Sequence, residues 1–107
     1  MPADPGGTYR VSTPGPVIQL LRVWAERAVK RGLREKFTAN LRAVQQGLTT
    51  EPLAWGEERY TLAGRKARVC QGAVPWLHVT YSVDEQARVV FVMEVRLMPN
   101  SPLADAP

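Results

Sequence analysis

Two apolar stretches near the C-terminal end of the chain decide its fold. They are WLHVTYSV at residues 76–83 and RVVFVMEVRLM at residues 88–98. In each stretch one set of alternate side chains is apolar throughout, which is the period of a strand with one buried face. The polar residues 84–87 between them are typical of a hairpin connection. We therefore predict an antiparallel pair of strands at the centre of a larger sheet.

Upstream of this pair the apolar residues follow a helical period. Pro16 suits the first turn of a helix, and Gly32 and Gly47 are the predicted ends of two consecutive helices. Two adjacent amphipathic helices joined at a glycine predict a helical hairpin whose apolar stripes must cover an apolar surface. The two stripes consist of Ile18, Leu21, Trp24, Ala25 and Ala28, and of Phe37, Leu41, Val44 and Leu48.

Three further strands complete the expected sheet, at residues 9–11, 59–62 and 66–71. The order is then a short strand, two helices and a four-stranded meander. This order predicts an α+β fold in which the two-helix hairpin packs on one face of a mostly antiparallel, curved sheet of four to five strands. Residues 9–98 form the expected single domain. Proline and glycine near both ends predict flexible tails at residues 1–8 and 99–107.

The composition is that of one ordinary small domain. The chain has 107 residues, 45% of them hydrophobic, and a formal net charge of +4. Eight basic and four acidic residues lie in the first 55 positions, so the whole excess of positive charge lies in the N-terminal half of the chain. Arg27, Lys30, Arg31 and Arg34 recur there at helical spacing. They form either a solvated helix face or a surface for a nucleic acid or an acidic partner.

Several classes of protein are excluded by what the chain lacks. A single cysteine, Cys70, cannot form an internal disulfide, and one cysteine with one histidine does not make a structural zinc site. No apolar run has the length of a membrane span, and the N-terminal residues do not follow the pattern of a secretory signal. We expect a cytoplasmic protein that needs no metal or cofactor and does not bind a membrane.

The sheet face turned away from the helices is the expected place for function. If Val83 pairs with Val89, His78 lies opposite Glu94 and Trp76 lies opposite Arg96. In the alternative register, the numbers of two paired residues add up to two less. Lys66 and Arg68 have the same parity and are expected on this face as well. A histidine beside a glutamate can also be an ordinary cross-strand pair. Trp76 suits packing, partner contact or base stacking, and Cys70 is expected to be inert.

Such a set of side chains could cleave RNA. A base must take the proton of a ribose 2′-hydroxyl, cations must stabilise the charge that develops on the phosphate, and an acid must protonate the leaving oxygen. Histidine can fill either proton role near neutral pH. The expected catalytic residues are His78, Arg68, Lys66 and Arg96, and the expected substrate-binding residues are Trp76, Glu94 and Arg65.

The chain resembles the RelE/ParE toxins of type II toxin–antitoxin systems. The resemblance rests on the element order and on three short motifs: LTTEP at residues 48–52, LHVTYSVD at residues 77–84 and VVFV at residues 89–92. It implies a RelE-like fold and a proteic antitoxin as partner. In the RelE branch it implies metal-independent cleavage of mRNA on the ribosome. In the ParE branch it implies inhibition of DNA gyrase.

The resemblance also indicates which residues match the family's site and which do not. Lys66 and Arg68 resemble a pair of basic residues on the third strand of the nucleases. His78 stands where an arginine is usual. The basic residue that the family carries near the end of the last strand aligns with Met98, and Arg96 lies two positions earlier. No tyrosine or histidine follows Tyr81, although active nucleases carry one near the C-terminus.

Three functions remain open on these residues. The first is a ribosome-dependent endonuclease with a partly degraded catalytic set. The second is a non-catalytic inhibitor of gyrase. The third is an inactive member that retains only antitoxin binding. Because antitoxins of this family are often acidic where they contact the toxin, we expect the basic cluster Arg27–Arg34 to be the contact.

Overall fold

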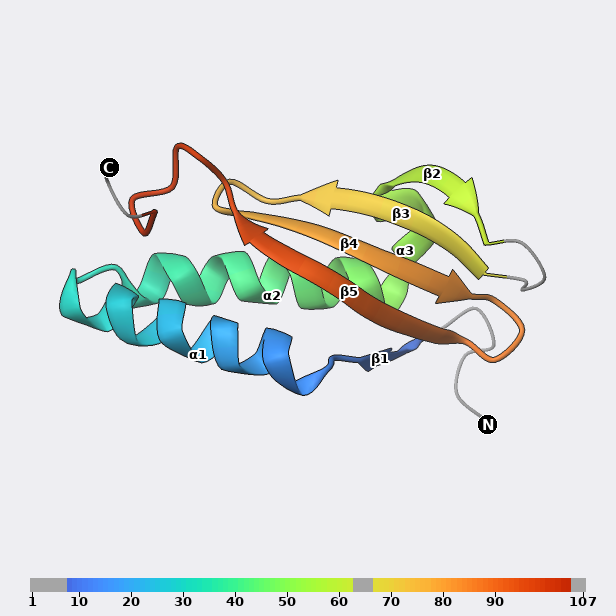
Figure 1. Ribbon diagram of the computed structural model, residues 1–107, viewed down its shortest axis with the longest axis horizontal. Coiled ribbons are helices and arrows are strands. Elements are labelled where there is room, and N and C mark those ends of the chain that lie inside the picture. The colour runs from blue at the N-terminus through green and yellow to red at the C-terminus, as the bar shows by residue number, and fades with distance from the viewer. Residues whose placement is uncertain (1–7, 63–66, 105–107) are drawn as a thin grey trace.

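The computed structural model describes residues 8–62 and 67–104 of the chain (Figure 1). It confirms the predicted α+β architecture. Five strands form one sheet in the order β1-β5-β4-β3-β2, in which only the pair β1–β5 is parallel. The elements in chain order are β1 (Arg10–Ser12), α1 (Gly15–Lys30), α2 (Arg34–Thr50), α3 (Pro52–Trp55), β2 (Glu57–Thr61), β3 (Ala67–Ala73), β4 (Leu77–Asp84) and β5 (Val89–Leu97).

The helices lie together on one side of the sheet, and the core lies between the two layers (Figure 1). Trp24 and Ala28 of α1 and Phe37 and Leu48 of α2 are buried there. The sheet contributes alternate residues of β4, as predicted: Leu77, Val79, Tyr81 and Val83. No helix of the described residues covers the other side, and none of them is long and apolar enough to cross a membrane.

The ends of the helices follow the sequence signals with one exception. Pro16 lies in the first turn of α1, and Gly32 follows its end with a φ of 70°, a left-handed conformation that suits glycine. Val17, rather than the predicted Ile18, faces the core. The exception is Gly47, which was expected to end the second helix but lies inside α2, three residues before its end.

A glycine lies inside α2 at position 47 because the helix there contacts Trp55 of the short helix α3. A Cβ atom at Gly47 or at Gly72 would lie too close to the Trp55 ring for ordinary van der Waals contact. The ring is also tilted against Tyr81, with 5.8 Å between the ring centroids. Trp55 is therefore held between α2 and the sheet, and the glycines provide its space.

The register of the sheet differs from the predicted one at two places. Ala73 pairs with His78 across a tight turn in which Val74 N–H donates to the carbonyl of Leu77. Even-numbered residues of β3 therefore share a face with odd-numbered residues of β4. In β5 a bulge adds one residue, Met93, between the pairs Thr80–Glu94 and Tyr81–Val92.

The bulge reverses the faces of the first half of β5. Val90 and Val92 are buried, whereas Phe91 is 48% and Met93 46% exposed. The predicted apolar face of residues 89, 91 and 93 was therefore wrong for Phe91 and Met93. Val95, beyond the bulge, is buried as expected. A single extra residue has this effect because successive side chains of a strand point to opposite faces.

Residues 99–104 pack on the helix hairpin, although a flexible tail was expected from residue 99. Leu103 is fully buried in the core, and Ser101 is buried beside it. Arg27 Nη1 donates to the carbonyl of Leu103, and Arg31 Nη1 donates to the carbonyl of Pro102, both at 2.7 Å. Part of the basic cluster predicted for a partner thus binds the chain's own C-terminal segment.

Candidate functional site

The surface of the sheet that no described helix covers is the candidate site, and we call it the open face. Its members follow from the register, because directly paired residues of neighbouring strands point to the same side. The side of the sheet opposite the helices is fixed by the buried residues Val79 and Tyr81, whose neighbours in β4 point the other way. By this rule the open face comprises Arg10, Ser12, Glu57, Tyr60, Ala67, Val69, Gln71, Ala73, His78, Thr80, Ser82, Asp84, Val89, Phe91, Glu94 and Arg96.

His78 and Arg96 are direct cross-strand partners on the open face. Such partners have Cβ atoms about 5 Å apart, within reach of one bound group. On its other side His78 is paired with Ala73, a small exposed residue. The imidazole Nδ1 is buried and has no hydrogen-bond partner within the described ranges.

Glu94 lies opposite Thr80 rather than opposite His78, so the predicted His78–Glu94 pair was wrong. The shift arises at the β4–β5 hairpin, where Asp84 rather than Val83 pairs with Val89, and at the bulge in β5. Glu94 instead forms an ion pair with Arg96 at 3.5 Å between Oε1 and Nε. Both side chains are more than half exposed, and an ion pair of this kind contributes little stability. Arg96 can exchange Glu94 for another anion at little cost.

Arg68 does not belong to the open face. It pairs with Val83, whose side chain is buried on the helix side, so the parity expected for Arg68 was wrong. Its guanidinium forms ion pairs with Glu58 at 3.7 Å and with Glu85 at 3.5 Å. The other two basic residues predicted for the site, Arg65 and Lys66, lie outside the described residues.

Trp76 is also absent from the open face. It lies in the turn between β3 and β4, where its backbone N–H donates to Asn40 Oδ1 at 2.9 Å and its carbonyl accepts from Met98 N–H. The partly buried ring packs against the core. Of the three interpretations of this tryptophan, the structure agrees with packing, and the predicted pair of Trp76 with Arg96 was wrong.

Exposed apolar side chains are the part of the open face that the sequence did not predict. Tyr60 of β2 is 53% exposed, and Phe91 is exposed in the same cross-strand row, with the buried residues Val69 and Ser82 between them. Met93 is exposed at the bulge. No signal in the sequence distinguishes Phe91 and Met93 from core residues, because a bulge has no residue signature of its own here. Tyr60 lies in a predicted strand, but its face depends on a second bulge in β2.

The remaining nucleophile, Cys70, is buried on the helix side beside Tyr81. Burial raises the pKa of the Cys70 thiol, and the nearby carboxylate of Glu58 raises it further. Burial likewise raises the pKa of the Tyr81 phenol. Cys70 is therefore protonated and inert at neutral pH. Within the described ranges, no group of three His, Cys, Asp or Glu side chains could hold a metal ion.

Comparison with known proteins gives a structural likeness only. No protein-family profile and no curated protein matches the chain. A chain of the archaeal RelE–RelB complex from Pyrococcus horikoshii OT3 superposes with a TM-score of 0.52 and 16% identity, over 88% of this chain and 99% of that one. A conserved hypothetical protein from Helicobacter pylori, HP0892, gives a TM-score of 0.37 and 22% identity, over 82% and 92% of the two chains. Element order, sheet topology and the archaeal superposition agree, and the chain has a RelE-like fold.

Proposed function

We propose that this protein is the toxin of a toxin–antitoxin pair and that its open face cleaves mRNA on the translating ribosome. The RelE-like fold supports the first part, because the similar archaeal chain was solved in a RelE–RelB complex. One observation carries the second part. A histidine and an arginine are cross-strand partners on a sheet face that no described helix covers.

The chemistry assigned to this pair is a transesterification within the RNA. The phosphorus is transferred from the 5′-oxygen of one nucleotide to the 2′-oxygen of the nucleotide before it. Nε2 of His78 takes the proton of the 2′-hydroxyl, and the 2′-oxygen then attacks phosphorus. The bond from phosphorus to the 5′-oxygen breaks, and that oxygen takes a proton from water. Arg96, released from Glu94, stabilises the negative charge that develops on the phosphate oxygens. The exposed ring of Phe91 offers a surface on which a base can stack.

The test is primer extension on mRNA from a translating extract that contains the purified protein. We expect new 5′ ends at the ribosomal A site, with a loss of at least about a hundredfold in His78→Gln and about tenfold or more in Arg96→Ala. Arg68→Ala is the matched control, since it removes an ion-paired arginine from the opposite face and should leave cleavage unchanged. Equal cleavage by wild type and His78→Gln would contradict the proposal, as would equal loss in Arg68→Ala.

A second candidate is a toxin-like protein that binds its partners without cleaving RNA. The observation in its favour is that Arg68 and Arg96 are both ion-paired with carboxylates, which lowers the positive charge available for phosphate. Intact mRNA in the same extract, together with normal translation, would favour this candidate. A gyrase supercoiling assay at saturating protein then separates a gyrase inhibitor from a protein that binds only an antitoxin.

A further inference from the structure

A row of hydrogen-bonding side chains lies on the open face directly beside the pair His78–Arg96. Thr80 follows His78 by two positions in β4, and Glu94 precedes Arg96 by two positions in β5. Thr80 and Glu94 are themselves cross-strand partners. Residues two positions apart in a strand point to the same face and lie about 7 Å apart. A group bound between His78 and Arg96 therefore has Thr80 and Glu94 as its neighbours along the two strands.

Thr80 presents a hydrogen-bond donor to a ligand on this face. Its other cross-strand partner is Gln71, whose Nε2 donates to Thr80 Oγ1 at 3.4 Å. Both side chains are half-buried, which limits their freedom to reorient. A hydroxyl that accepts one hydrogen bond still has its own hydrogen to donate. The row thus offers a hydroxyl donor at Thr80 next to the carboxylate oxygens of Glu94, which only accept.

Arg96 holds Glu94 only loosely. The 3.5 Å between Glu94 Oε1 and Arg96 Nε is longer than a charge-assisted hydrogen bond, which is about 2.7–2.9 Å. The side chains of Glu94 and Arg96 are 57% and 61% exposed, so water solvates both groups. A phosphate that binds Arg96 replaces this carboxylate. Binding of a nucleotide by its phosphate therefore releases Glu94, one residue pair away, for a contact with another part of the same nucleotide.

The chemistry of this row fits one of the four RNA bases. Guanine alone has two parallel N–H donors on its Watson–Crick edge, N1–H and N2–H, which match the two oxygens of a carboxylate. The O6 acceptor beside them matches the Thr80 hydroxyl. Adenine and cytosine place a ring-nitrogen acceptor next to their amino group, and uracil has one N–H between two carbonyls. Each of these three bases would turn an acceptor toward Glu94, which disfavours its binding.

We propose that Glu94 and Thr80 recognise guanine in the nucleotide whose 3′-phosphate lies between His78 and Arg96. The ribose that joins a base to its 3′-phosphate spans about the spacing of the two residue pairs. Met93, 46% exposed beside Glu94 at the bulge, offers its thioether to the face of the base. The inference rests on the proposed function in taking RNA as the ligand, and it adds a preference for guanine on the 5′ side of the cut.

The test measures the binding of the four ribonucleoside 3′-monophosphates to the full-length protein. These probes contain base, ribose and 3′-phosphate but no phosphodiester bond that the proposed reaction could break. His78 is the only histidine of the chain, so its imidazole resonances in an NMR titration report binding at this site directly. We expect guanosine 3′-monophosphate to bind at least about tenfold more tightly than each of the other three.

Glu94→Gln should bring the four affinities to within about threefold of one another. Because Arg96 then has no competing carboxylate, the affinity for adenosine 3′-monophosphate should stay equal or increase. Arg96→Ala should weaken all four nucleotides by a similar factor, since it removes a contact to the phosphate that they share. Thr80→Val, which keeps the shape of the side chain and loses the hydroxyl, should reduce the preference for guanine by a smaller factor than Glu94→Gln.

Glu85→Gln is the matched control. It also removes a carboxylate that forms an ion pair with an arginine at 3.5 Å, but Glu85 lies in the β4–β5 hairpin and its partner is Arg68. This variant should keep the full preference for guanine. Equal binding of the four nucleotides by wild type would overturn the proposal. A preference that persists in Glu94→Gln, or that is lost equally in Glu85→Gln, would overturn it as well.

The titration contains no ribosome and no cleavable RNA, so it separates this inference from the nuclease. A guanine preference that depends on Glu94, found together with intact mRNA in the translating extract, would support the binding site and remove the proposed nuclease. Cleavage of mRNA together with equal binding of the four nucleotides would support the nuclease and remove the role assigned to Glu94.

Discussion

Among single residues, Tyr81 connects the centre of the sheet to the segment between α2 and β2. Its buried hydroxyl donates to the carbonyl of Pro52 in α3, and its ring packs against Trp55. A buried carbonyl that loses its donor costs about 1–3 kcal/mol, so this hydroxyl contributes to stability beyond the ring's burial. Because burial raises the pKa of both Tyr81 and Cys70, the folded state also resists their ionisation.

We predict that Tyr81→Phe lowers the free energy of unfolding by about 1–2 kcal/mol at pH 7. Above about pH 9 the unfolded chain loses the Cys70 and Tyr81 protons while the folded chain keeps them, so wild-type stability falls as pH rises. Tyr81→Phe removes one of the two groups, and its stability should fall less steeply. Urea unfolding at pH 7 to about 10.5 measures both effects. A wild-type stability that is flat or rises over this range would contradict the linkage.

At the scale of helices and strands, the sequence predicts the elements, whereas the pairing between strands depends on local irregularities. The helical periods and the alternation of residues 76–83 were enough to predict the helices, the central strands and the layer they form. They could not determine which residues pair across strands, because pairing depends on a tight turn at residues 74–77 and a bulge at Met93. The candidate site depends on that pairing. His78 and Arg96 were therefore assigned to the correct face, while Arg68, Trp76 and the partner of His78 were assigned wrongly.

The short helix α3 is not among the elements predicted from the sequence, and its contact with α2 gives a prediction at this scale. Gly47→Ala should destabilise the protein by about 1–3 kcal/mol, although alanine favours helices, because the new Cβ would press on the Trp55 ring. The ring cannot move aside, since Gly72 and Tyr81 lie against it. Gly15→Ala, which meets nothing within 4 Å, should be neutral or stabilise by up to about 1 kcal/mol. Thermal melts compare the two, and a Gly47→Ala variant as stable as Gly15→Ala would refute the role of Trp55.

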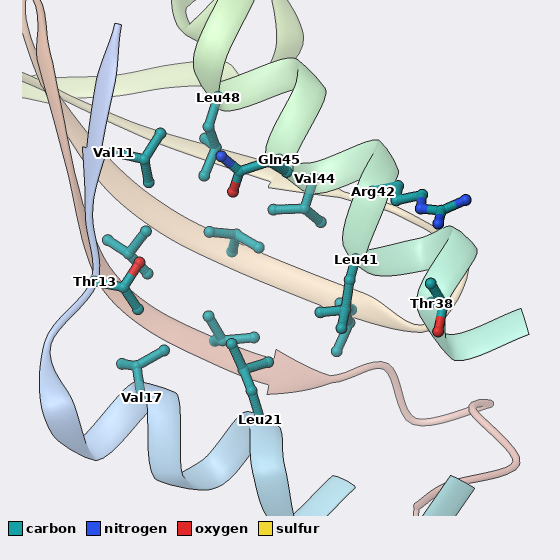
Figure 2. A pocket seen from close by; sticks show the side chains of 14 residues that line it. Val11, Thr13, Val17, Leu21, Thr38, Leu41, Arg42, Val44, Gln45 and Leu48 are labelled. Carbon is teal, nitrogen blue, oxygen red and sulfur yellow. The ribbon is translucent and has the colours of Figure 1, made fainter. Parts of the chain in front are cut away.

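For the whole molecule, the two layers present two different surfaces. The open face has a histidine and an arginine in one cross-strand pair, and exposed aromatic rings in a separate row that crosses β4 at Ser82. The helix side has an apolar groove between α1, α2 and the sheet, with Arg42 among its lining residues (Figure 2). The sheet separates the two surfaces.

The most direct test of the central claim is the number of viable cells after induced expression of the chain without an antitoxin. The account predicts growth arrest by wild type and by Arg68→Ala, which removes an ion-paired arginine outside the open face. It predicts at least about tenfold more survivors for His78→Gln with Arg96→Ala at equal protein level. Undiminished growth on wild-type expression, or equal arrest by the His78 and Arg96 double variant, would contradict the claim that the open face is the toxic surface.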